Sequence, residues 1–149
     1  MKKAILICAV AAACGVLTAG DSPESIARDV VALERTALDG WLTGNPDPFL
    51  AIADPDITYF HAVASQRLDG LPAVRALLES YRGMPLFDSY EIAAPKVQSS
   101  GDTAILTYVL VRHAGNGVTR WNTTQIYQRK KPGWRIVHSH YSQANATQP

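Results

Sequence analysis

The sequence has very little cysteine, and what it has lies near the N-terminus. Cys8 and Cys14 are the only cysteines among 149 residues. A domain that begins after residue 20 therefore has no thiol, which excludes a disulfide, a cysteine nucleophile and a thiolate metal ligand. An excess of charge is also lacking, since the formal net charge is +1 and becomes 1 − 2 = −1 without Lys2 and Lys3. This balance predicts no electrostatic attraction to nucleic acid or to anionic lipid.

Long apolar runs are absent as well, apart from one at the N-terminus. Two lysines precede an apolar run over 4–17, and the small residues Thr18-Ala19-Gly20 follow it. This order is typical of a signal peptide over 1–20, so we expect export to the periplasm or the exterior. The run is shorter than the roughly twenty residues that span a membrane. Alternatively, residues 11–15 (AAACG) are similar to a lipoprotein signal, in which case a lipid on Cys14 anchors the domain to a membrane.

Helical spacing of apolar residues marks the first half of the chain. A first helix is expected from the capping residue Ser22 to a stop at Gly44, with charged residues such as Glu34 largely off its apolar face. That face is formed by Ile26, Val30, Leu33, Ala37 and Trp41. A second, short helix follows Asp47-Pro48 and ends at Asp54-Pro55, and a third covers 69–81.

Alternating patterns mark the second half. Short strands are predicted over 57–61 and 65–69, and long strands over 89–98, 103–113, 118–129 and 134–142. Tight-turn residues separate the last four, which predicts an antiparallel meander. We therefore expect one α+β domain over 21–142, followed by a flexible tail over 143–149. Its cone-shaped, strongly curved antiparallel or mixed sheet would carry three helices on the concave face, with a small-molecule cavity between them.

The final strand reads as a strict alternation. One face is expected to carry Trp134, Ile136, His138, His140 and Ser142. The other face would carry Arg135, Val137, Ser139 and Tyr141.

These elements contain the motifs of a known family. They are the run Asp54-Pro55-Asp56-Ile57-Thr58, then Gly70, Pro95 and Val97, the run Gly101-Asp102-Thr103-Ala104, then Tyr108, Thr124, Trp134, Val137, His138, His140 and Ser142. The chain resembles the nuclear transport factor 2-like superfamily, which includes ketosteroid isomerases, SnoaL-type polyketide cyclases and scytalone dehydratase. Within it, the chain is most similar to the calcium/calmodulin-dependent protein kinase II association domain and its standalone bacterial relatives.

The resemblance implies rings of dimers and a cavity whose arginines can bind a carboxylate. Leu110 and Gln125 stand where that family tends to place arginines, while Arg112 and Arg120 lie nearby. We therefore expect a homodimer through the open face of the sheet, with a higher oligomer as the alternative.

Few acidic residues occur in the long strands, which bears on catalysis. Proton abstraction beside a carbonyl normally uses a carboxylate in an apolar cavity, and no acidic residue sits in mid-sheet. A histidine is the alternative base, because its ordinary pKa suits proton transfer near neutrality. The candidate catalytic residues are the types that a dehydratase-like site needs, namely Tyr59, His61, His138 and Asp56.

Two of the histidines also have a spacing that suits a metal. His138 and His140 are two apart on a strand and could share one ion if His61 or His113 supplied a third ligand. We favour hydrogen bonding within the sheet or at a dimer face, and expect neither a metal nor a cofactor.

Aromatic and polar side chains together form the candidate ligand site. Tyr127 is a further aromatic candidate for the cavity wall. In the alternative, Trp41 and Trp134 are core anchors and Trp121 belongs to a subunit interface. Alternation alone does not fix which face of strand 118–129 looks inward. The expected ligand-binding residues are Trp41, Tyr59, Arg120, Trp121, Asn122, Thr124, His138 and His140.

Three functions are compatible with these features. Binding of a small organic molecule without turnover is favoured because a mid-sheet carboxylate base is missing. The second is a proton-transfer enzyme of the isomerase, cyclase or dehydratase type. The third is a non-catalytic oligomerisation module.

Overall fold

The computed structural model describes residues 21–144, in which the chain forms three helices and six strands. The predicted signal peptide and residues 145–149 lie outside the described residues. The helices are α1 (Pro23–Trp41), α2 (Asp47–Ile52) and α3 (Leu71–Glu79). The strands are β1 (Ala53–Phe60), β2 (Leu68–Asp69), β3 (Ser89–Ser100), β4 (Thr103–Ala114), β5 (Gly117–Lys130) and β6 (Gly133–Gln143). The predicted α+β class is confirmed.

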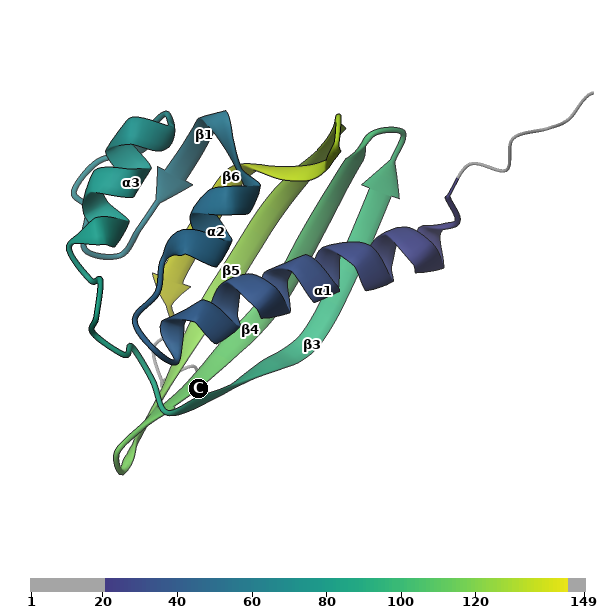
Figure 1. The fold of residues 1–149 in the computed structure, drawn as a ribbon. Helices are drawn as coiled ribbons and strands as arrows, with labels where there is room; N and C mark the ends of the chain where they lie inside the picture. The colour runs from purple at the N-terminus through teal and green to yellow at the C-terminus, as the bar shows by residue number, and fades with distance from the viewer. Residues whose placement is uncertain (1–20, 145–149) are drawn as a thin grey trace, which may run out of the picture.

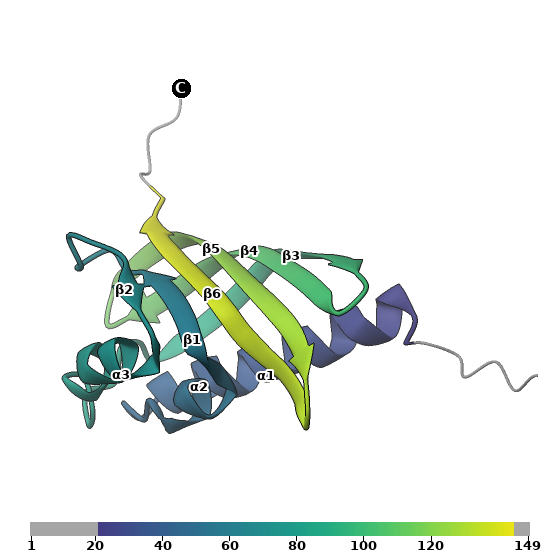
Figure 2. The ribbon, with the colours of Figure 1, turned by 90° about the horizontal axis from the view of Figure 1, so that it is seen from above.

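All six strands form one mixed, curved sheet. Its order is β2-β1-β6-β5-β4-β3, and every pair is antiparallel except β1 with β6. Figure 1 shows α1 crossing the sheet at an angle, and Figure 2 shows all three helices on the same side of it. The other face carries no helix among the described residues. Within residues 21–144, no helix is both long and apolar enough to cross a membrane.

Helix α1 is built as its sequence predicts, with one exception. The Ser22 side chain accepts a hydrogen bond from the Ser25 N–H (3.2 Å), which caps the helix start. The exception is Glu34, which is 0% exposed, so the prediction that it lies off the apolar face is wrong. It follows Val30 by four residues and precedes Leu38 by four, which places it in the middle of the buried stripe.

A β-bulge in β6 overturns the predicted alternation of that strand. Tyr127 pairs with Ile136 but Ile126 pairs with His138, so Val137 is an extra residue in β6. One inserted residue exchanges the two faces of everything beyond it. Trp134 and Ile136 therefore share the helix-covered face with Ser139 and Tyr141, not with His138 and His140 as the alternation suggested.

Candidate functional site

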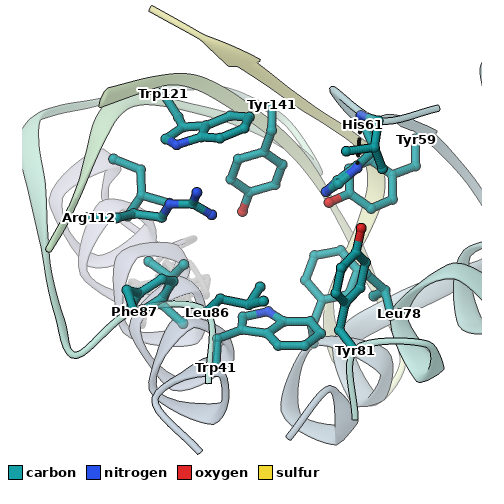
Figure 3. Close-up of a pocket in the computed structure, with 14 residues that line it drawn as sticks. Trp41, Tyr59, His61, Leu78, Tyr81, Leu86, Phe87, Arg112, Trp121 and Tyr141 are labelled. Carbon is teal, nitrogen blue, oxygen red and sulfur yellow. Dashed lines mark hydrogen bonds between the residues drawn. The ribbon is translucent and has the colours of Figure 1, made fainter. Parts of the chain in front are cut away.

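A pocket lies between the helices and the concave face of the sheet. It has a volume of about 210 Å³ and mainly apolar walls (Figure 3). This is below the roughly 300–1,000 Å³ of pockets that hold drug-sized ligands, so a single ring with a short chain is a fitting size. The lining residues are Leu38, Trp41, Phe49, Tyr59, His61, Val63, Leu78, Tyr81, Leu86, Phe87, Leu110, Arg112, Trp121 and Tyr141.

Tyr59 is the centre of the aromatic wall. It lies two residues after the buried Ile57 in β1, so its ring points to the concave face. Its ring centroid is 5.9 Å from that of Phe49, 5.4 Å from that of His61 and 6.1 Å from that of Tyr141. Burial, followed by the negative charge of Glu34, raises the pKa of Tyr59, so its hydroxyl stays protonated at neutral pH.

Arg112 supplies the cation of the pocket. Its guanidinium carbon lies 4.5 Å from the centroid of the Trp121 ring and 5.9 Å from that of Phe87. Its Nε donates a long hydrogen bond to Thr119 Oγ1 (3.4 Å). No Asp or Glu of residues 21–144 forms an ion pair with it. Burial lowers the pKa of Arg112, and the guanidinium points into the pocket without a counter-charge (Figure 3).

His61 adds a polar group on the wall formed by β1. Burial, followed by the positive charge of Arg112, lowers the pKa of His61, which favours the neutral ring near pH 7. Its Nδ1 accepts a hydrogen bond from the Val63 N–H (3.3 Å), so the ring proton lies on Nε2 and can be donated to a ligand.

Backbone hydrogen bonds fix the loop that closes the side of the pocket opposite the sheet. The Leu86 N–H donates to the Trp41 carbonyl (3.1 Å), and the Gly83 N–H donates to the Gly44 carbonyl (2.9 Å). The end of α1 is thereby held against the segment between α3 and β3. That contact positions Leu86 and the adjacent Phe87 on the pocket wall.

A buried carboxylate lies directly behind the pocket. Glu34 Oε1 accepts hydrogen bonds from Tyr108 Oη (2.5 Å), Tyr141 Oη (3.0 Å) and Gln125 Nε2 (3.1 Å), and its Oε2 accepts from Tyr127 Oη (2.7 Å). We call Glu34 and these four donors the Glu34 cage. No Lys, Arg or His of the described residues forms an ion pair with this carboxylate. Burial, followed by the charge of Glu34, raises the pKa of all three cage tyrosines.

The structure brings four of the predicted site residues together and separates the rest. Trp41, Tyr59, His61 and Trp121 line the pocket. Asp56 lies exposed in β1, where its N–H donates to Asp54 Oδ1 (3.0 Å). The remaining predicted residues lie on the uncovered face, because the buried positions of β5 are Thr123, Gln125 and Tyr127 and the bulge turns the β6 histidines outward. These residues are Arg120, Asn122, Thr124, His138 and His140.

His138 has partners of its own on the uncovered face. Its Nδ1 lies 2.8 Å from Thr58 Oγ1, and the exposed ring of Phe60 packs against both His138 (5.9 Å between centroids) and His140 (5.7 Å). Burial, followed by the neighbouring His140, lowers the pKa of His138. In residues 21–144, no three His, Cys, Asp or Glu side chains are grouped closely enough to hold a metal ion.

Sequence reasoning missed Arg112, Tyr141 and Glu34. The signal for Arg112 was its position two and four residues after Leu110 and Tyr108, which puts it on the same buried face of β4. The signal for Glu34 was a charged residue four positions from an apolar neighbour on either side. Tyr141 could not be assigned to the pocket face without knowledge of the bulge, and no residue type in β6 indicates that bulge.

Comparisons with known proteins agree with this architecture. Residues 26–145 match the family model of the calcium/calmodulin dependent protein kinase II association domain. A ketosteroid isomerase-like protein from Parabacteroides distasonis is 28% identical, with a TM-score of 0.72 over 85% of this chain and 90% of that one. The S. rosetta kinase hub is also 28% identical, with a TM-score of 0.65 over 85% of this chain and 100% of the hub.

A third structure shows the likeness of fold alone. The association domain of the C. elegans kinase is 21% identical, with a TM-score of 0.70 over 83% of this chain and 99% of that domain. A search of curated protein sequences gives no match. Since the family model covers most of the chain, the protein belongs to the calcium/calmodulin-dependent protein kinase II association domain family, on a nuclear transport factor 2-like fold.

Proposed function

We propose that this protein binds a small organic carboxylate with an aromatic ring in the pocket. The observation that carries the proposal is the guanidinium of Arg112, which is half-buried between two aromatic rings and forms no ion pair among the described residues. A partly buried charge without a partner is costly, and a bound carboxylate would supply that partner. Arginine suits this role because its planar donors match the two carboxylate oxygens.

The rest of the pocket suits the apolar part of such a ligand. Its aromatic walls would pack against a ring, and the His61 Nε2–H would add a hydrogen-bond donor near the cation. The family resemblance supports the same class of ligand, although this chain has Leu110 and Gln125 at the positions where that family tends to place arginines.

Titration with 3-phenylpropionate, followed by tryptophan fluorescence, tests the proposal, because Trp41 and Trp121 both line the pocket. The neutral analogue 3-phenylpropanol isolates the contribution of the carboxylate. Arg112→Met should weaken binding of the acid by about ten- to a hundredfold, since a hydrogen bond to a charged group contributes about 1.5–3 kcal/mol. The alcohol should be affected little.

Arg120→Met is the matched control. Arg120 lies on β5 with its side chain exposed, outside the pocket, so its loss should leave affinity for the acid unchanged. Equal affinity for acid and alcohol in the unaltered protein, or equal weakening by the two arginine variants, would contradict the proposal.

We further propose that the uncovered sheet face joins two copies of the chain. Support comes from Phe60, which is 44% exposed and packs between two outward-facing histidines, and from the hub assemblies named among similar structures. Light scattering on residues 21–149 should give a dimer or a larger oligomer. Phe60→Asp should reduce its mass, whereas Val63→Asp, at an exposed residue outside the strands, should not. A monomeric unaltered protein would refute this.

Export remains a proposal from residues 1–20. We infer cleavage after Gly20 or, alternatively, lipidation of Cys14. Expression of the full chain followed by cell fractionation and mass measurement of the mature protein distinguishes the two. A cytoplasmic product that retains residue 1 would contradict both.

A further inference from the structure

The Glu34 cage reaches the pocket through a single side chain. Tyr108 and Tyr127 are 4% and 0% exposed and do not line the pocket, whereas Tyr141 lines it and donates to Glu34 at the same time. Gln125 Nε2 donates to Tyr141 Oη (2.8 Å). The Tyr141 oxygen therefore accepts one hydrogen bond and donates another, and it keeps one free lone pair for the pocket.

This arrangement is the geometry of a proton relay. A proton that arrives from the pocket at Tyr141 Oη can be matched by the departure of the phenol's own proton to Glu34 Oε1, 3.0 Å away. The phenol is then neutral before and after the transfer, so its raised pKa is no obstacle to the step. The mid-sheet carboxylate that the long strands lack is thus supplied by Glu34 of α1, which contacts the pocket through Tyr141.

A structural role alone does not explain why position 34 carries a carboxylate. Burying a carboxylate with only neutral donors costs free energy, and well-packed apolar side chains at position 34 and at its partners would avoid that cost. The amide oxygen Oε1 of Gln125 is also buried and has no hydrogen-bond partner among the described residues. Buried polar groups that lack a hydrogen-bond partner or a counter-charge next to a pocket are typical of catalytic sites.

We propose that the pocket catalyses keto–enol tautomerisation of a 2-oxo acid with an aromatic side chain, with Tyr141 and Glu34 as its proton relay. The inference rests on the proposed function, since it needs the ligand carboxylate at Arg112. Tyr141 Oη takes a proton from the carbon next to the carbonyl, while its own proton passes to Glu34. The electron pair of the broken C–H bond forms the C=C bond, and the carbonyl oxygen becomes the enolate oxygen. Return of the proton through Tyr141 to that oxygen gives the enol, and its return to carbon restores the ketone.

Proton exchange in phenylpyruvate tests the relay directly. The protein is placed in D₂O with phenylpyruvate, and the loss of the proton signal at the carbon next to the carbonyl is followed by NMR against buffer alone. General acid–base catalysis contributes about 10²–10⁴-fold, so exchange should be at least about 100-fold faster than in buffer. Tyr141→Phe and Glu34→Gln should each return it to the buffer rate, and Glu34→Asp should restore part of it.

Binding of 3-phenylpropionate, which has no carbonyl, is measured in parallel. It should change by less than about threefold in Tyr141→Phe and Glu34→Gln, which separates loss of the relay from loss of the site. Tyr90→Phe is the control, because Tyr90 Oη donates to Asp39 (2.6 Å) outside the pocket. This variant should exchange at the unaltered rate.

The outcomes separate the two proposals. If 3-phenylpropionate binds but exchange stays at the buffer rate, the relay is refuted and the binding proposal stands. If 3-phenylpropionate does not bind, the binding proposal fails on its own readout. If exchange survives in a folded Tyr141→Phe variant, the relay is overturned even if Glu34→Gln does not fold.

Discussion

Replacing Glu34 with leucine should destabilise the fold because of the donors it leaves behind. Tyr141 can turn its hydroxyl to the pocket, and Gln125 Nε2 still has the Tyr141 oxygen as an acceptor. Tyr108 and Tyr127 have no such alternative, since they are 4% and 0% exposed. A buried donor without an acceptor costs about 1–3 kcal/mol, so two phenols cost roughly 2–6 kcal/mol. Release of a buried charge acts in the opposite direction, and we expect a net loss of about 2–3 kcal/mol from the free energy of unfolding.

The same reasoning predicts a rescue. Adding Tyr108→Phe and Tyr127→Phe to Glu34→Leu removes both unpaired hydroxyls, and replacing all partners of a buried hydrogen bond by apolar groups is close to neutral. The triple variant should therefore be more stable than Glu34→Leu and should regain about half of the loss or more. Guanidinium unfolding of residues 21–149, followed by tryptophan fluorescence, measures both values. A triple variant less stable than Glu34→Leu would refute the explanation, because the cost would then lie in lost packing.

Three further outcomes follow from single contacts. Gly44→Ala should lower the free energy of unfolding by more than about 3 kcal/mol, because a Cβ there would lie 2.4 Å from a backbone atom and the residue has φ +69°. Gly83→Ala, at φ +79° with no atom within 4 Å, should lower it by only about 1–2 kcal/mol, and thermal unfolding measures both. Lys130→Met should destabilise the protein at pH 7 by removing the 2.6 Å ion pair between Lys130 and Asp54. Burial raises the pKa of the Asp54 carboxyl, but Lys130 and a backbone N–H lower it by more, so the net pKa is lowered. The difference in stability from the unaltered protein should therefore shrink below about pH 4 and vanish as Asp54 protonates in both proteins. Burial lowers the pKa of His61 in the empty pocket, and an anionic ligand should raise it. Calorimetry in buffers of different ionisation enthalpy should therefore detect proton uptake on binding at pH values between the lowered pKa of the free protein and the raised pKa of the complex, and no uptake would place the carboxylate away from His61.

The sequence predicted the elements well because their signals are local. Capping at Ser22, the glycine-rich turns and the alternation of β4 each depend on a few neighbouring residues, and each element appears within a few residues of its predicted bounds. β6 is the informative failure. Its bulge at Val137 comes from pairing with β5 and β1, and β1 itself has a register shift against β6, so the side chains beyond it could not be assigned to a face from their own pattern.

The candidate site was harder to predict for a second physical reason. The face of a strand can be predicted from alternation, so a carboxylate in a strand can be assigned to the interior, whereas Glu34 reaches the same interior from α1. Its burial depends on three phenols contributed by β4, β5 and β6, and none of these contacts is visible in any one segment. Long-range polar networks of this kind are fixed by the assembled fold.

The opposite charges around the pocket determine which way a ligand can lie. Arg112 points into the pocket, while the negative charge of Glu34 is separated from the pocket by the phenol of Tyr141. The Tyr141 proton is already donated to Glu34, so this hydroxyl offers the pocket only an acceptor, and a carboxylate placed against it would find no donor. Two hydrogen-bond lengths would separate such a carboxylate from Glu34 by about 5–6 Å, and at an effective dielectric constant of about 20 the repulsion is about 3 kcal/mol. This corresponds to more than a hundredfold in affinity. A monocarboxylate must therefore direct its charge to Arg112 and present a neutral, proton-bearing part to Tyr141, which is the orientation that the relay requires.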